Sequence, residues 1–179
     1  MTRVLNVREK TGREVLTGSR DGIAFALKVV EELDKLAPGE ILLIDLVGIK
    51  MMDVSYANQA FVNPMKMLIE ENKENNLKAI RFKVSNEIIK SVLSRVLYDH
   101  GLLALVMLND TIEVIGSVGR SINDAFRKIF SFGEVSIDTL PSLMGVDENT
   151  CINRIRRLIF SGVIKEYDRD GKKLYAVKV

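Results

Sequence analysis

The chain has 179 residues, of which 47% are hydrophobic and 28% are charged, and its formal net charge is +2. This balance is ordinary for a chain that buries a core, and it excludes the disordered, collagen-like and low-complexity classes. The length leaves room for one domain or for two small ones. Because the longest apolar runs fall far short of the roughly 20 residues that a bilayer span requires, we expect no transmembrane helix and no membrane partner.

The small numbers of His and Cys residues limit the kinds of site that the chain can form. One His and one Cys leave little material for a zinc site or for a Cys/His nucleophile pair, so we expect no metal, no cofactor and no catalytic residues. A single cysteine forms no internal disulfide, which agrees with a reducing compartment. Charges occupy the positions where a signal peptide needs an apolar stretch, so we expect a cytoplasmic protein.

From the start to about Gly116, extended apolar segments alternate with amphipathic helical ones, which predicts a sheet covered by helices. Val4–Val7 is the first predicted strand. Ser19 is predicted to cap a helix that ends before Pro38-Gly39. The run Ile41–Ile44 is apolar on both faces and predicts a buried strand. The predicted inward stripe of the first helix consists of Ile23, Ala26, Leu27, Val30, Leu33 and Leu36.

Pro64 interrupts the apolar stripe of the next helical segment. Either the helix kinks there, or Asn63 caps a second helix that begins at Pro64. Residues 77–84 alternate between apolar and polar as a half-buried strand does. A further helix with a stripe from Ile88 to Leu97 follows. Two apolar segments then flank Asn109-Asp110, which is a two-residue hairpin signal.

The C-terminal segment, residues 117–179, differs from residues 1–116 in its order of predicted elements and in its charge, and we expect it to form a second domain after residues 1–116. A helix and a short turn or stub of strand are followed by residues 137–144, Gly145 and a second helix that Gly162 ends. Residues 163–167 and 173–177 alternate as strands around a polar turn. From Gly119 onward there are 11 basic and 8 acidic residues, net +3, so the remainder of the chain is −1.

This order of elements resembles the winged helix-turn-helix of transcription regulators over residues 124–179. The resemblance rests on segments 137–140, 143–146, 149–150, 155–159 and 161–164 and on the charged hairpin. Leu140, Leu143 and Val146 are placed to pack the two helices, and Gly145 permits the tight turn. Asp147 is placed to cap the second helix, which leaves its first turn able to enter a major groove.

The resemblance implies two sets of contacts with double-stranded DNA. Asparagine suits adenine and arginine suits guanine, because each offers two hydrogen bonds, so the base-reading set is Asn149, Thr150, Asn153 and Arg154. The phosphate set is Arg156, Arg157, Arg169, Lys172 and Lys173.

A protein-binding use of the same domain stays open. The arginines of the second helix can equally form a solvated face. Acidic residues reduce affinity for phosphates, and four of them lie close to the predicted contacts: Asp147, Glu148, Asp168 and Asp170.

The stretch from residue 41 to residue 55 has a strand that ends in Asp45, a bend, and then Asp53-Val54-Ser55 opening a helix. It resembles the STAS fold of anti-sigma-factor antagonists, and more closely the STAS-like domains of unknown function, over about residues 1–116. In antagonists the residue after the second Asp is a serine that accepts phosphate, whereas here it is Val54.

That departure leaves two interpretations of the switch region. Either Ser55 accepts phosphate at the start of the helix, where the helix dipole favours it, or Ser55 or Asp53 only caps the helix. Asp45 likewise serves a partner or only accepts hydrogen bonds from loop amides.

Taken together, the sequence predicts an α/β STAS-like domain followed by an α+β winged helix-turn-helix domain. We expect a DNA-binding transcription regulator whose first domain mediates sensing, protein interaction or dimerisation. A homodimer matches paired half-sites on DNA. The alternative is an adaptor, in which the STAS-like domain docks a kinase or anti-sigma-like partner and the winged helix contacts another protein.

Overall fold

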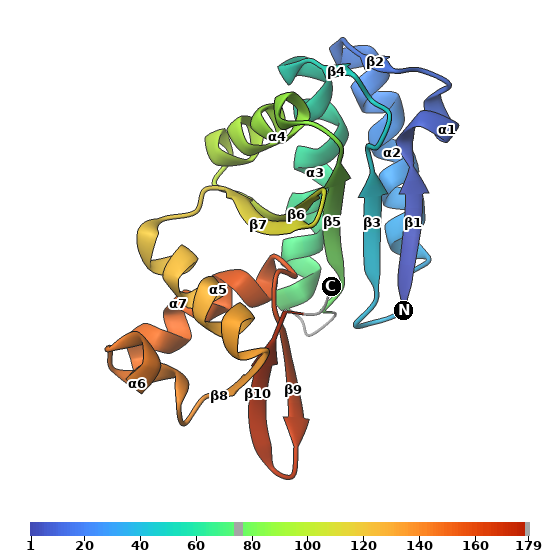
Figure 1. Cartoon of the computed structure of the whole chain (residues 1–179). Helices are drawn as coiled ribbons and strands as arrows, with labels where there is room; N and C mark the ends of the chain where they lie inside the picture. The colour runs from blue at the N-terminus through green and yellow to red at the C-terminus, as the bar shows by residue number, and fades with distance from the viewer. Residues whose placement is uncertain (74–76, 178–179) are drawn as a thin grey trace.

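A computed structural model describes residues 1–73 and 77–177, and it has an α/β fold built on a five-stranded mixed sheet (Figure 1). The strands lie in the order β1 (Thr2–Asn6), β3 (Ile41–Asp45), β5 (Ala79–Val84), β6 (Leu103–Leu108) and β7 (Thr111–Gly116). The first four are parallel, and β7 returns antiparallel to β6 through the hairpin predicted at Asn109-Asp110. The α/β class and the predicted buried strand are confirmed.

Three long helices cover one face of this sheet: α2 (Ser19–Asp34), α3 (Val54–Lys73) and α4 (Glu87–Asp99). The strand order advances in one direction, and right-handed crossovers therefore place each connecting helix on the same side. Their apolar faces meet the sheet in a first core that includes Leu42, Phe82 and Val106. At the far end, α1 (Val7–Thr11) precedes a small parallel pair, β2 (Val15–Leu16) and β4 (Met51–Met52).

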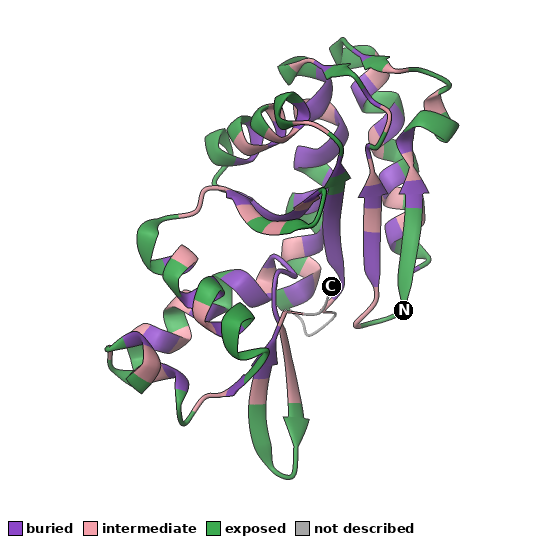
Figure 2. Cartoon of the chain, viewed as in Figure 1, coloured by how far each residue is buried: buried purple, intermediate pink, exposed green. Residues whose placement is uncertain are grey.

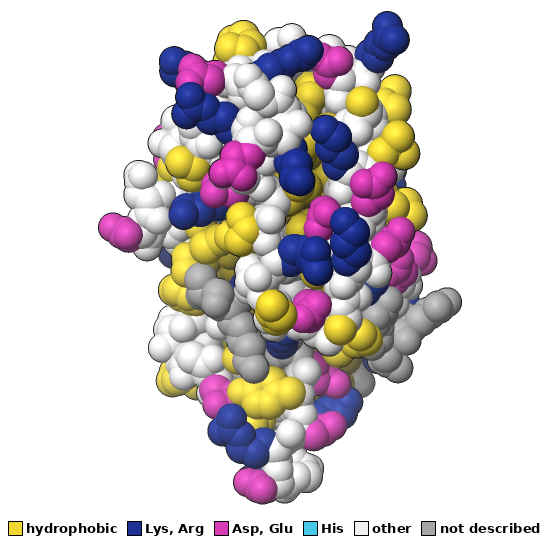
Figure 3. Space-filling view, turned by 90° about the vertical axis from the view of Figure 1, so that its right-hand side faces the viewer, with side chains coloured by type: hydrophobic (Ala, Val, Ile, Leu, Met, Phe, Trp, Pro, Cys, Tyr) yellow, Lys and Arg dark blue, Asp and Glu magenta, His cyan; other side chains and the backbone are white. Residues whose placement is uncertain are grey.

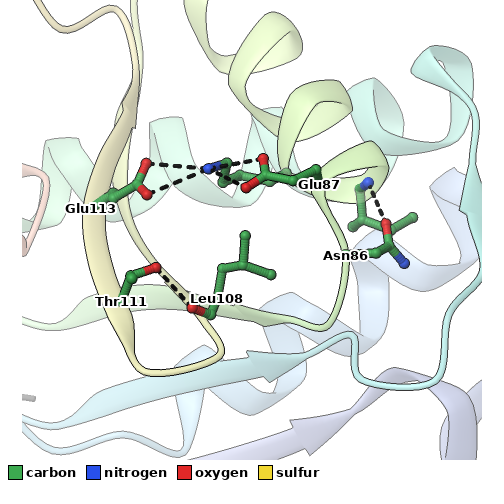
Figure 4. A network of polar contacts seen from close by, with 7 residues as sticks. Asn86, Glu87, Leu108, Thr111 and Glu113 are labelled. Atoms are coloured by element: carbon green, nitrogen blue, oxygen red, sulfur yellow. Dashed lines mark hydrogen bonds and ion pairs between the residues drawn. The ribbon is translucent and has the colours of Figure 1, made fainter.

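An ion pair also joins the β6–β7 hairpin to helix α4. The Nζ atom of Lys90 on α4 lies 2.9 Å from Glu87 and 3.3 Å from Glu113 of β7, and these contacts raise the pKa of Lys90. At the start of α4, the side chain of Asn86 accepts a hydrogen bond from the Ile89 amide, while Thr111 closes the hairpin (Figure 4). The antiparallel edge strand is thus fixed to the helix that precedes β6.

The predicted inward stripe is correct at its end, where Leu33 of α2 and Leu36 just after it are buried, and wrong at its start. Ile23 and Leu27 are 53% and 64% exposed, whereas Gly22, Phe25 and Val29 are buried. The cause is the approach of α3, because a Cβ atom on Gly22 would lie 2.7 Å from the Tyr56 carbonyl oxygen. A stripe chosen from large apolar side chains could not include the glycine that lets the two helices meet.

Smaller corrections concern the ends of elements. The first strand begins at Thr2 and ends at Asn6, which caps α1, so Val7 is helical. Gly18 rather than Ser19 precedes α2, and no side chain caps it. One helix runs through Pro64. In α4 the buried stripe excludes Ile88, which is 62% exposed.

The C-terminal unit, residues 117–177, combines three helices with a three-stranded antiparallel sheet. Its helices are α5 (Arg120–Phe132), α6 (Leu140–Met144) and α7 (Glu148–Phe160). Its strands β8 (Glu134–Ser136), β10 (Lys172–Ala176) and β9 (Lys165–Arg169) lie in that order. The β9–β10 hairpin projects away from the main sheet, and its tip is exposed (Figure 2). Residues 178–179 of the predicted second domain lie outside the described residues.

The two units share a core. Leu103 and Leu105 of β6 pack with Phe126, Ile155 and Leu158 on the face of the sheet opposite α2, α3 and α4. This explains why β5 departs from its predicted half-buried pattern, since Lys83 alone in that strand is exposed. The N-terminal unit, residues 1–116, therefore cannot present a bare sheet surface at β5 and β6.

Polar contacts cross the same boundary. The Asn72 side chain at the end of α3 donates to the Phe160 carbonyl at 2.8 Å, and Lys165 donates to the Gly39 carbonyl. Gly162, with φ of +71°, lies directly against Ala79, where a Cβ atom would come within 2.5 Å of the alanine Cβ. The C-terminal end of α7 is consequently seated on the main sheet.

We expect Gly162→Ala to lower the free energy of unfolding by about 3 kcal/mol or more, because a left-handed conformation costs an alanine about 1–2 kcal/mol and overpacking adds to it. Urea unfolding monitored by circular dichroism measures the loss. Gly171→Ala is the matched control, since Gly171 has φ of +75° with open space around it. Equal losses in the two variants would contradict close packing at the boundary.

Candidate nucleic-acid interface

The first turn of α7 is shaped by its cap. One carboxylate oxygen of Asp147 accepts the Thr150 amide at 2.9 Å, and the other accepts the Thr150 hydroxyl at 2.6 Å. These hydrogen bonds lower the pKa of Asp147. The predicted capping role of Asp147 is confirmed, and it fixes the start of α7 at Glu148.

The predicted base-reading residues divide over two sides of α7. Asn149 and Asn153 are four residues apart, share one face and are exposed. Thr150 and Arg154 are half-buried on the flank, and the Thr150 hydroxyl is engaged by Asp147. On the opposite side, Cys151 is fully buried as a small apolar residue, with its pKa raised by that burial.

The predicted phosphate-binding cations differ in how they are engaged. Arg169 pairs with Glu134 at 3.1 Å and stacks over the Tyr167 ring, and Lys173 pairs with Glu166 at 2.9 Å. Arg156 and Lys172 are exposed, and within residues 1–73 and 77–177 neither makes an ion pair. Two cations of the β9–β10 hairpin, Arg169 and Lys173, are therefore already engaged by carboxylates of the same unit.

Arg157 lies apart from this set. Its guanidinium donates to the carbonyls of Gly101 and Ser117, at 3.4 and 3.3 Å, which belong to the far ends of α4 and β7. The side chain thus bridges the two units. Sequence reasoning placed it with the phosphate contacts because the position of α7 against the main sheet is not encoded in the spacing of α7 itself.

A groove of about 390 Å³ lies between α7 and the β9–β10 hairpin, and the sequence analysis did not predict it. Its lining combines two cations, Arg156 and Lys173, and two carboxylates, Glu148 and Glu166, with Ile152 and other apolar residues. Ile152 is half-buried on a helix in which Cys151, Ile155 and Leu158 are fully covered, and this is the local signal of the groove.

The predicted switch residues lie at the end of the molecule remote from the β9–β10 hairpin (Figure 1). Asp45 accepts the Val47 amide at 2.9 Å, as a loop carboxylate does. Asp53 accepts the amides of Tyr56 and Gly18, at 2.6 and 2.9 Å, so it caps α3 and anchors the start of α2. Ser55 is exposed in the first turn of α3. The structure brings Asp53 and Ser55 to one helix start.

No family model matches this chain, and no curated protein is significantly similar to it. Among the described residues, no helix has the length and apolarity to cross a membrane. The same residues contain no group of three or more His, Cys, Asp or Glu side chains placed to hold a metal ion.

We expect Asp147→Ala to destabilise the protein more at pH 7 than in acid. The native pKa of Asp147 is depressed, so its capping contribution is complete above the unfolded pKa and is lost as the pH falls through the native value. In thermal unfolding measured from pH 7 to about pH 2, the difference in melting temperature between wild type and Asp147→Ala should shrink as the pH falls. Asp147→Asn keeps an accepting oxygen and should stay close to wild type at pH 7. A difference in melting temperature between wild type and Asp147→Ala that does not change with pH would refute the role of the charged cap.

Proposed function

We propose that this chain is a DNA-binding transcription regulator, with a winged helix-turn-helix in its C-terminal unit and a STAS-like domain in its N-terminal unit. The observation that carries the proposal is the capped, exposed first turn of α7 beside a projecting antiparallel hairpin. The order α5, β8, α6, α7, β9, β10 and the short link at Gly145 are what the resemblance implies. This arrangement suits insertion of α7 into a major groove.

In this function Asn149, Asn153 and Arg154 contact base edges, and Thr150 supports the helix start. Arg156 and Lys172 contact phosphates directly. Arg169 and Lys173 join them by leaving their carboxylates, which costs little because exposed ion pairs contribute only about 0–1 kcal/mol. The C-terminal half of α7, including Arg157, stays against the main sheet and orients the helix.

The N-terminal unit is proposed to sense a signal or bind a protein partner, and a homodimer would present two copies of α7 to paired half-sites. Ser55 is the proposed position of modification, since its hydroxyl is exposed where the α3 dipole favours a phosphate. Asp53 is not available for a partner in the same way, because both its oxygens accept backbone amides.

An adaptor that uses the winged helix for protein contacts is the second candidate. It is favoured by the engagement of three predicted phosphate contacts within the protein: Arg157, Arg169 and Lys173. With these occupied, and with carboxylates alongside, the exposed surface of the C-terminal unit is of mixed sign.

Binding to a fluorescent random-sequence duplex across a range of salt concentrations separates the two functions. A DNA-binding protein loses affinity steeply as salt rises, and Lys172→Ala should reduce the slope of log K against log salt by about 1. Lys66→Ala, which removes an exposed lysine from α3 in the other unit, should leave the slope unchanged. Absence of binding at low salt would favour the adaptor.

Arg154→Ala tests base reading directly. If Arg154 contacts a guanine, discrimination at one position of the preferred site should fall by about 1–3 kcal/mol, while other positions keep theirs. Selection from a random duplex library, followed by affinity measurements on single-base variants, gives this value. An equal loss on every sequence would assign Arg154 to the phosphate backbone instead.

A further inference from the structure

A small cavity of about 160 Å³ lies in the N-terminal unit, at the opposite end from the α7 interface. It is formed where α1, the following turn, α2 and the start of α3 meet. Leu16 and Phe25 supply apolar wall, and charged side chains surround it. The side of the molecule that carries β1 and α1 has lysines and arginines interspersed with carboxylates (Figure 3).

The charge around this cavity is positive. Lys10, Arg13 and Lys28 line it from three separate elements, against a single carboxylate, Asp21, which pairs with Arg13. The ammonium of Lys28 donates to the Lys10 carbonyl at 3.2 Å, which brings α2 and α1 together beside the cavity. The formal charge of the lining residues is therefore three minus one, or +2.

Tyr56 adds a donor that lacks a partner. Its side chain lines the cavity, its exposed fraction is 1%, and within residues 1–73 and 77–177 its hydroxyl has no hydrogen-bond partner. A buried hydroxyl without a partner is unfavourable and rare in folded proteins. Burial raises the pKa of Tyr56, with Asp21 adding to the effect and Arg13 opposing it, so the group remains a neutral donor.

We propose that this cavity binds a small oxyanion, a phosphate group or a short carboxylate, with Tyr56 donating to an anion oxygen and the three cations balancing its charge. The volume equals that of about five water molecules at roughly 30 Å³ each, which fits a few heavy atoms. Pockets for drug-sized ligands enclose about 300–1,000 Å³, so this smaller space suits a single anionic group. The site is independent of the DNA-binding proposal, since it shares none of its residues.

Isothermal titration of the full chain with inorganic phosphate and, separately, with butyrate tests this site, with sodium chloride holding ionic strength constant. The expected result is saturable binding of one anion per chain. Binding of phosphate alone assigns a phosphoryl ligand, and binding of butyrate alone assigns a carboxylate with an apolar body against Leu16 and Phe25. Failure of both anions to bind at millimolar concentration would overturn the proposal.

Two variants locate the binding. Lys28→Met should lower the affinity for the anion about tenfold, as expected when a hydrogen bond from a charged group is removed. Tyr56→Phe should weaken it too, yet leave thermal stability without anion equal to or above wild type, because it deletes a hydroxyl without a partner. Lys66→Met, on the outer side of α3, is the control. Anion affinity that is unchanged in both cavity variants would refute the site.

Discussion

The structure depends on strand β6 serving two cores at once. Ala104 and Val106 face α2, α3 and α4, while Leu103 and Leu105 face the C-terminal unit. A sheet whose parallel strands advance in one direction receives all its helices on one side, so its other side needs separate cover. Here the C-terminal unit provides that cover over β5 and β6. Its position is therefore set by burial of apolar surface rather than by a hydrogen bond alone.

Elements whose signal is local could be predicted from sequence. The apolar run of β3, the hairpin at Asn109-Asp110 and the cap at Asp147 depend on residues within a few positions of one another. Features set by a distant segment could not be predicted. Gly22 faces inward because α3 packs closely against it. Arg157 donates to the Gly101 carbonyl because α7 packs against β6. The Tyr56 hydroxyl, which has no hydrogen-bond partner among the described residues, likewise results from how α1, α2 and α3 meet.

The face of the sheet that the C-terminal unit covers also buries a charged residue. Arg81 on β5 lies in one row with Leu43 and Leu105, and it is 1% exposed. Burial lowers its pKa to about 10, so it stays charged at neutral pH, and two of its nitrogens have no hydrogen-bond partner among the described residues. Desolvating an arginine is unfavourable. Burial of Leu105 and its neighbours on the same face is the favourable contribution that opposes it.

Helix α3 connects the two ends of the molecule at which function is proposed. Tyr56 in its first turn lines the small cationic cavity, and Asn72 in its last turn holds the Phe160 carbonyl at the end of α7. Sixteen residues of helix separate them, about 24 Å at 1.5 Å per residue. One continuous helix therefore reaches from the proposed anion site to the C-terminal end of α7.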